Sequence, residues 1–121
     1  MKEIRILLNK TQKQYLVNNA FRYGEMGKKH TDSDKKNKMV READSLMEAL
    51  SNMDNVTRLV TLSMKDTITA LTICKYTMGV LSTKTIPEYE KKGNDIYKKR
   101  AIKKLDLVTK LYNKISKKVR K

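Results

Sequence analysis

Hydrophobic residues recur at steps of three and four over most of the chain, which is the spacing of helices that bury one face. One such helix follows residue 11, a second covers about residues 35–50, a third runs from about Asn55 to Leu81, and the last reaches the C-terminus. The apolar stripe of the third helix is broad, as in a helix that others cover on several sides. The pattern predicts an all-α or nearly all-α fold, a bundle of three to four main helices forming one domain over residues 1–121.

Residues 3–8 fit two kinds of local structure. Ile4, Ile6 and Leu8 alternate with Arg5 as in a short strand, whereas Ile4, Leu7 and Leu8 fit a helix equally well. The bundle is therefore predicted with or without a short N-terminal strand.

Polar residues and glycines mark the ends of the first predicted helix. Thr11 and Gln14 predict a capping box, in which the Thr11 hydroxyl accepts from a backbone amide and the Gln14 side chain reaches back. Gly24 and Gly27 are predicted to end this helix, because glycine adopts the left-handed conformation without steric cost. The stretch from Gly24 to Asp34 is then a polar loop.

The later helices carry similar signals. The second helix is predicted to be capped by Asp32, Ser33 or Asp34. The cap predicted for the third helix is Asp54. A second capping box is predicted at Thr85-Ile86-Pro87-Glu88. Proline is tolerated in the first turn of a helix, because the backbone amide that it lacks would have no partner within the helix there. Gly93 and Asn94 are expected to break the helix that follows, and Asn94 or Asp95 to restart it.

Composition narrows the class of protein. Of the 121 residues 39% are hydrophobic, and the presence of only four glycines and one proline favours long helices over short strands. The single cysteine, Cys74, excludes an intrachain disulfide and is typical of a reducing compartment, so we expect a cytoplasmic, intracellular protein. The most apolar stretch, residues 53–81, is interrupted by charged residues such as Arg58 and Lys65, and we expect no membrane span.

The net charge of +15 is distributed unevenly. Residues 1–37 carry nine Lys or Arg against four Asp or Glu, and residues 38–83 carry five against five. Residues 84–121 carry fourteen against four, a net of +10. Repulsion of that size destabilises a compact chain, so a polyanionic partner is favoured over a face that only keeps the protein soluble. We therefore predict a basic C-terminal helical segment over residues 84–121.

The last predicted helix separates its apolar and basic residues onto opposite faces. Ala101, Leu105 and Val108 begin the apolar face at steps of four and three. At about 100° per residue, six lysines fall within an arc of about 60° on the other face. They are Lys99, Lys103, Lys110, Lys114, Lys117 and Lys121, and Arg100, Lys104 and Lys118 widen the face on one side. Lysine acts as a point charge whereas arginine reads base edges, so we predict phosphate-backbone binding with little sequence specificity.

The expected partner is a nucleic acid, DNA or RNA. The secondary contacts predicted for it are Arg5, Lys10, Lys13 and Arg22. A basic amphipathic helix can instead lie on an anionic membrane, but this one has neither Trp nor Phe on its apolar side, so we expect no membrane partner. The alternative function is a protein–protein interaction subunit or inhibitor within a larger nucleoprotein assembly, or a homo-oligomer. The broad apolar surface of residues 53–81 would support it.

Residues 4–21 resemble two patterns. One is the start of transposon-encoded RNA-guided nucleases of the OrfB type, matched by Arg5, Lys10, Gln12 and Leu16. The other is the strand and first helix of ribbon-helix-helix DNA-binding proteins, which implies that Arg5 faces the groove and that Ile4 and Ile6 form a dimer core. The chain departs from the first by lacking a cysteine quartet and from the second by a long loop after residue 23. Both resemblances point to nucleic acid, and no activity is carried over from either.

The sequence contains no pattern typical of a catalytic or metal site. His30 is the only histidine, so neither a Ser-His-Asp triad nor a zinc site can be assembled around it. Cys74 lies in an apolar stripe and is predicted to be a buried small hydrophobe. Phe21 and Tyr23, which flank Arg22, could stack on bases, but at helical spacing at least one is expected in the core. We therefore expect a non-catalytic protein without cofactor or metal.

Overall fold

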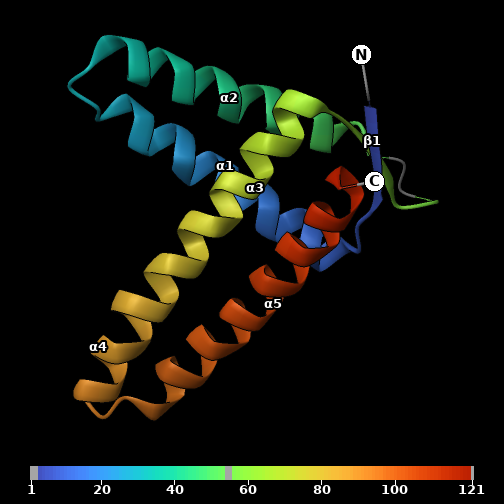
Figure 1. Cartoon of the computed structure of the whole chain (residues 1–121). Coiled ribbons are helices and arrows are strands. Elements are labelled where there is room, and N and C mark those ends of the chain that lie inside the picture. The colour runs from blue at the N-terminus through green and yellow to red at the C-terminus, as the bar shows by residue number, and fades with distance from the viewer. Residues whose placement is uncertain (1–2, 54–55, 121) are drawn as a thin grey trace.

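The chain forms two helical hairpins that meet at a small sheet (Figure 1). The computed structural model describes residues 3–53 and 56–120. Its elements in chain order are β1 (Glu3–Leu7), α1 (Lys10–Lys28), α2 (Ser33–Ser51), β2 (Leu59–Ser63), α3 (Met64–Val80), the π-helical turn η1 (Leu81–Thr85), α4 (Ile86–Lys91) and α5 (Asp95–Val119). The predicted helical bundle is confirmed, with a short N-terminal strand.

Strand β1 pairs antiparallel with β2. Ile4 lies opposite Leu62 and Ile6 opposite Val60. Because successive side chains of a strand point to opposite faces, both isoleucines are buried whereas Arg5 is exposed. The alternation of residues 3–8 therefore belongs to a strand, and its partner lies within the same chain. The two isoleucines join the chain's own core, which differs from the dimer core implied by the ribbon-helix-helix resemblance.

The prediction of one helix from about Asn55 to Leu81 was wrong at its start. Leu59–Ser63 forms strand β2, in which Val60 and Leu62 are buried and Thr61 is exposed. The same apolar residues fit helical spacing, so pairing with β1 decides between the two structures.

Helix α3 is capped by a residue of the strand that precedes it. The Ser63 hydroxyl oxygen accepts from the Asp66 amide at 3.1 Å, so α3 begins at Met64. The predicted cap Asp54 lies outside the described residues.

Helix α1 begins earlier than predicted. Asn9, not Thr11, is its N-cap: the Asn9 side-chain oxygen accepts from the Gln12 amide at 2.7 Å. The Gln12 side-chain oxygen in turn accepts from the Asn9 amide at 3.1 Å, which completes a capping box. Thr11 and Asn9 have similar capping chemistry, and the position of the turn after β1 selects Asn9.

The two glycines predicted to end α1 lie inside it. A Cβ atom at Gly27 would lie 2.6 Å from the Cβ of Met39, and one at Gly24 would lie 3.0 Å from the Cβ of Ala43. These glycines therefore let α1 and α2 approach closely, and the helix continues to Lys28. The loop is correspondingly shorter than predicted. As expected, Asp32 caps α2, accepting from the Asp34 amide at 2.9 Å.

The predicted capping box at Thr85 is absent, because the backbone there stays helical from α3 through η1 into α4. The Ile86 amide donates to the Leu81 carbonyl five residues earlier, which is the spacing of a π-turn. Pro87 has no amide, and its ring would clash with the carbonyl four residues back in a regular α-helix. The wider turn accommodates the proline.

The helix ends after α4 where predicted. Gly93 has a φ of 69°, in the left-handed region that glycine adopts without strain, and Asn94 caps α5 by accepting from the Tyr97 amide at 3.2 Å. Helix α5 then runs back along α3 and ends beside β1 (Figure 1). The core lies where the sheet and the helices meet, and its fully buried members include Ile6, Leu16, Leu46, Leu62, Leu111 and Ile115. Within the described ranges, every helix is too short or too polar to cross a membrane.

Candidate nucleic-acid interface

Helix α5 is the longest element and carries the predicted basic face. Its 25 residues extend about 37 Å. Ala101, Val108, Leu111 and Ile115 are buried against the rest of the protein. Five lysines of the predicted face lie on the other side of the helix: Lys99, Lys103, Lys110, Lys114 and Lys117. We call these five the lysine ridge. The predicted sixth member, Lys121, lies outside the described residues.

The lysine ridge is long enough to span several base pairs of a nucleic acid. From Lys99 to Lys117 it extends about 27 Å, at about 1.5 Å per residue. This length corresponds to about eight base pairs at about 3.4 Å per step. Helix α5 as a whole contains nine Lys or Arg and two acidic residues, Asp95 and Asp106.

The protein's own groups engage part of the ridge. The Lys110 ammonium lies 3.0 Å from a carboxylate oxygen of Asp106, with side chains 72% and 64% exposed. An ion pair this exposed is worth about 0–1 kcal/mol, so a phosphate can displace it at low cost. Lys114 is half-buried and donates to Gln12 of α1 at 3.3 Å. In the described part of the chain, the other three ridge lysines are exposed and take part in no ion pair.

Arg100 lies over one ring of an aromatic pair near the start of α5. Its guanidinium carbon lies 5.5 Å from the ring centroid of Tyr97, which stacks on Tyr89 of α4 with centroids 5.6 Å apart. Nearby, Lys98 forms an ion pair with Glu90 at 3.5 Å. The Tyr89–Tyr97 stack and the Lys98–Glu90 ion pair join α5 to α4, whereas the cation–π contact of Arg100 with Tyr97 lies within α5.

The structure brings together two predicted residues that are far apart in the sequence. Arg22 of α1 and Lys104 of α5 both line a groove of about 390 Å³, whose other lining residues come from α1, α3 and η1. We call it the α1–α5 groove. Lys104 directly follows Lys103 of the lysine ridge, so the groove opens beside the ridge. Lys118 is exposed one residue beyond the last ridge lysine.

The remaining predicted cations do not join the ridge. Arg5 projects from the sheet face opposite Ile4 and Ile6, and α5 packs with those isoleucines in the core. Lys10 is exposed and Lys13 is half-buried at the start of α1. At about 100° per residue, Lys13 points to the side of α1 that carries Gly24, which faces α2. The predicted secondary contacts therefore lie on several surfaces.

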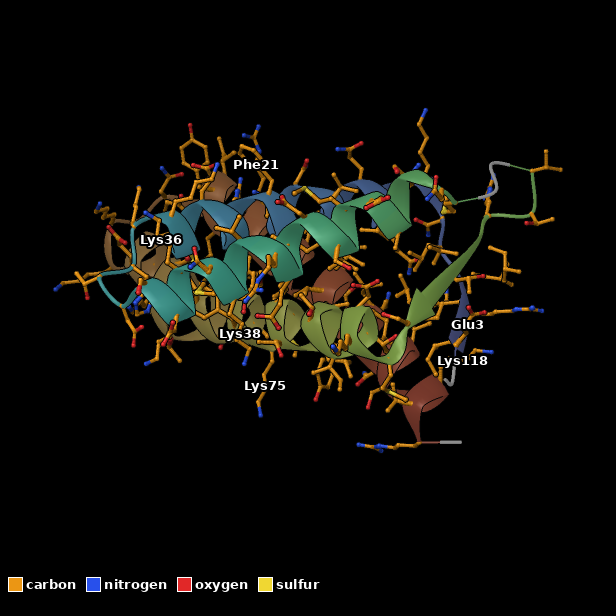
Figure 2. All side chains as sticks on the ribbon, turned by 90° about the horizontal axis from the view of Figure 1, so that it is seen from above. Glu3, Phe21, Lys36, Lys38, Lys75 and Lys118 are labelled. Atoms are coloured by element: carbon orange, nitrogen blue, oxygen red, sulfur yellow. The ribbon has the colours of Figure 1, made fainter. Side chains whose placement is uncertain are left out.

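Sequence reasoning missed a second basic region at the connection between α1 and α2. Lys28 ends α1, Lys29 lies in the connection, and Lys35, Lys36 and Lys38 lie in the first turns of α2; all five are exposed. Lys28 pairs with Glu25 at 3.0 Å. Figure 2 shows Lys36 and Lys118 toward opposite ends of the molecule. The signal was present as lysine pairs on either side of a predicted loop, but that stretch also contains Asp32 and Asp34, which reduce its net charge.

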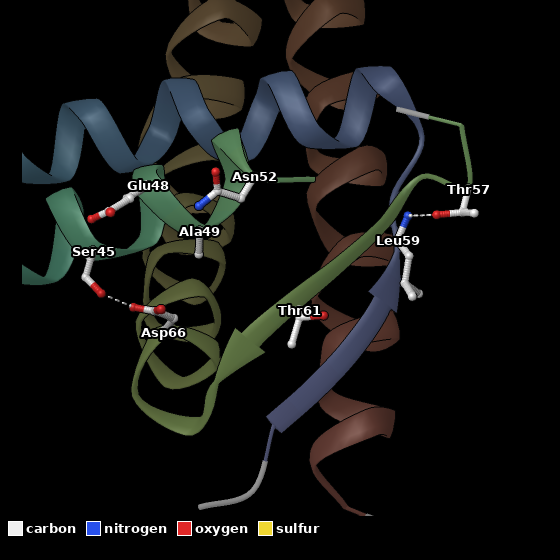
Figure 3. Close-up of a pocket in the computed structure, with 8 residues that line it drawn as sticks. All are labelled: Ser45, Glu48, Ala49, Asn52, Thr57, Leu59, Thr61 and Asp66. Atoms are coloured by element: carbon white, nitrogen blue, oxygen red, sulfur yellow. Dashed lines mark hydrogen bonds between the residues drawn. The ribbon is translucent and has the colours of Figure 1, made fainter. Parts of the chain in front are cut away.

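An acidic hollow of about 490 Å³ lies between α2, β2 and α3 (Figure 3). The Ser45 hydroxyl donates to a carboxylate oxygen of Asp66 at 2.6 Å, and Glu48 lines the same hollow. Two carboxylates repel a phosphate. The Asp66 carboxylate is already held by Ser45 of α2. The Ser45–Asp66 hydrogen bond joins α2 to α3, and the acidic lining of the hollow does not suit a nucleic acid.

The other candidate side chains lie in different surroundings. Burial raises the pKa of the Cys74 thiol to about 12, which leaves it protonated and unreactive at neutral pH. Tyr23 is half-buried and its hydroxyl lies 3.2 Å from Glu42, whereas Phe21 is 57% exposed. His30 is exposed in the α1–α2 connection. Within residues 3–53 and 56–120, no cluster of three or more His, Cys, Asp or Glu side chains could hold a metal ion.

Comparisons with protein-family models, with curated proteins and with solved structures found no match for this chain. Neither resemblance of residues 4–21 gains support from them.

Proposed function

We propose that this chain is a non-catalytic protein that binds nucleic acid, DNA or RNA, through phosphate contacts along the lysine ridge. The observation that supports it is the row of lysines on one face of a long helix whose opposite face is fixed in the core. Each ammonium group that meets a phosphate releases a condensed counterion, and this release favours binding. A straight, rigid row suits a ligand of fixed shape, such as a duplex or a structured RNA.

A protein–protein role is the second candidate, and the described apolar surface favours it less. In residues 53–81, Val60, Leu62 and Ile73 are buried in the core, so much of the stripe that would support this role is already covered. Val56 and Ile68 are 90% and 52% exposed. Light scattering tests this role, since a stable dimer would place such side chains in an interface.

The experiment for nucleic-acid binding is a salt series with a labelled duplex, followed by fluorescence anisotropy. The test variant changes Lys99, Lys103, Lys110 and Lys117 to Gln. We expect weaker binding and a salt slope flatter by up to about four units, because each lost phosphate contact removes about 0.9. Lys114 is left unchanged, since its contact with Gln12 would add a change in stability.

The matched control removes the same charge from other surfaces. It changes Lys29, Lys35, Lys65 and Lys75, all exposed and outside the ridge, to Gln. We expect this variant to keep most of the slope. If both variants weaken binding equally, net charge alone attracts the ligand and the ridge is not the site. If neither variant changes binding, or the unchanged protein binds no nucleic acid, the proposal is wrong.

A further inference from the structure

The α1–α5 groove combines an apolar floor with a cationic rim. Ile73 and Leu81, from α3 and η1, are buried apolar residues of its lining, and Arg22 and Lys104 line it from two different helices. Its volume of about 390 Å³ is within the range of about 300–1,000 Å³ in which small-molecule pockets fall. Its lining contains no Asp or Glu, in contrast to the acidic hollow beside β2. The charge of the groove therefore favours an anionic occupant.

The groove also offers groups that can recognise a planar heterocycle. Tyr76 lines it with a side chain that is 53% exposed, and an exposed aromatic ring stacks on bases of any sequence. Two amides, Asn18 and Asn19, line the α1 side. Asparagine amides have the donor and acceptor pattern that pairs with base edges.

Existing hydrogen bonds hold these amides in place. The Asn19 amide nitrogen donates to the Tyr15 carbonyl at 2.8 Å, and the Asn18 oxygen accepts from Gln14 at 2.9 Å. An amide group carries two donors and an oxygen acceptor, so one bond each leaves further capacity for a ligand. The groove thus provides an apolar surface, fixed polar groups and positive charge together.

We propose that the α1–α5 groove binds one unpaired nucleotide of the nucleic acid that lies along the lysine ridge. The base stacks on Tyr76, its edge meets Asn18 and Asn19, and its flanking phosphates lie between Arg22 and Lys104. Because Lys104 follows Lys103, a strand can pass from the ridge into the groove without crossing an acidic surface. This inference rests on the proposed function and adds a preference for nucleic acids with an unpaired base.

The test compares two labelled hairpins that are identical except for a single bulged adenine, prepared as DNA and as RNA. We expect the unchanged protein to bind the bulged hairpin more tightly. Tyr76→Leu should lower affinity for the bulged hairpin about tenfold, since base–aromatic stacking is worth about 1–3 kcal/mol, and leave the paired hairpin unaffected. Arg22→Gln should reduce the same preference independently of the ring.

Two control variants separate stacking on the Tyr76 ring from loss of its hydroxyl and from loss of an exposed aromatic side chain elsewhere. Tyr76→Phe keeps the stacking surface and should keep the preference. Phe21→Leu removes an exposed aromatic of α1 that does not line the groove, and should also keep it. Thermal unfolding of each variant checks that the fold is intact.

Three outcomes would overturn the inference. In the first, the unchanged protein binds the bulged and the paired hairpin with equal affinity. In the second, the Tyr76→Leu variant binds both hairpins as tightly as the unchanged protein does. In the third, this variant loses the same amount of affinity for both hairpins. If an acidic peptide competed with the bulged hairpin only when Tyr76 was present, the groove would belong to a protein partner instead. The quadruple lysine variant separates this result from failure of the proposed function, because it should weaken both hairpins together.

Discussion

The ammonium group of Lys114 donates to the side-chain oxygen of Gln12 over 3.3 Å, and this contact joins the last helix to the first. The same oxygen accepts from the Asn9 amide in the capping box of α1. One lysine of the basic face therefore stabilises the helix start that it contacts. Its neighbours Lys110 and Lys117 are exposed.

The first prediction separates these two roles of ridge lysines. Lys114→Met keeps the apolar stem but removes the charged donor, and should lower the free energy of unfolding by about 1 kcal/mol. Lys117→Met removes the same charge from an exposed position and should leave stability unchanged. Urea unfolding measures both. Equal stability of the two variants would show that the contact with Gln12 contributes nothing.

The second prediction is a gain of binding. At about 100° per residue, Asp106 lies within about 20° of the arc of the lysine ridge, where it pairs with Lys110. Asp106→Asn should therefore raise affinity for a duplex and steepen the salt slope by up to about one unit, because Lys110 becomes available to a phosphate.

The control for this gain is Asp44→Asn, which removes an exposed carboxylate from α2. It changes the net charge equally but lies outside the ridge. Equal gains from the two variants would show that the ligand responds to net charge and not to this helical face.

The sequence was sufficient to predict those elements whose signals are local. The amphipathic pattern of α5 predicted its apolar and basic faces, and Asp32 was among the caps predicted for α2. Strand β2 was missed because its partner β1 lies more than fifty residues earlier, and only the pairing excludes a helix over the same residues. The candidate site shows the same division: the ridge follows from one helix, whereas the placement of Arg22 and Lys104 along one groove requires the tertiary fold.

The glycines of α1 show why a local signal can mislead. Glycine both ends helices and permits two helices to approach, and the sequence around Gly24 and Gly27 favours neither use. The close approach of Met39 and Ala43 in α2 determines that these glycines serve helix packing, and those contacts cannot be predicted from the sequence of the first helix alone.

The third prediction follows from this packing. Gly27→Ala places a Cβ atom 2.6 Å from the Cβ of Met39, which forces the helices apart. Overpacking of this kind costs about 1–3 kcal/mol, more than the gain of about 1 kcal/mol from better helix propensity. Gly79→Ala is the control, since nothing lies within 4 Å of its added Cβ. We expect Gly27→Ala to lower the unfolding temperature and Gly79→Ala to raise it; the opposite order would contradict the packing.

The last prediction concerns alkaline pH. Burial raises the pKa of Cys74 in the folded protein to about 12, whereas an exposed thiol titrates near 9. Above pH 9 the unfolded chain loses this proton before the folded one does, so ionisation favours unfolding. The contribution to stability is therefore complete below pH 9 and is lost as the pH rises toward 12. The difference in stability between the unchanged protein and Cys74→Ala, measured by urea unfolding, should be constant below pH 9 and shrink above it.

The reactivity of the thiol gives an independent measurement of the same pKa. Alkylation by iodoacetamide requires the thiolate, so at pH 8 the native protein should react about 100-fold or more slowly than the chain unfolded in urea. Tyr15 provides the comparison within the same core, because burial also raises its pKa, which its phenol absorbance can follow. Rapid native labelling together with normal tyrosine titration would place Cys74 at the surface, and the packing of α3 against α1 and α5 would then be incorrect.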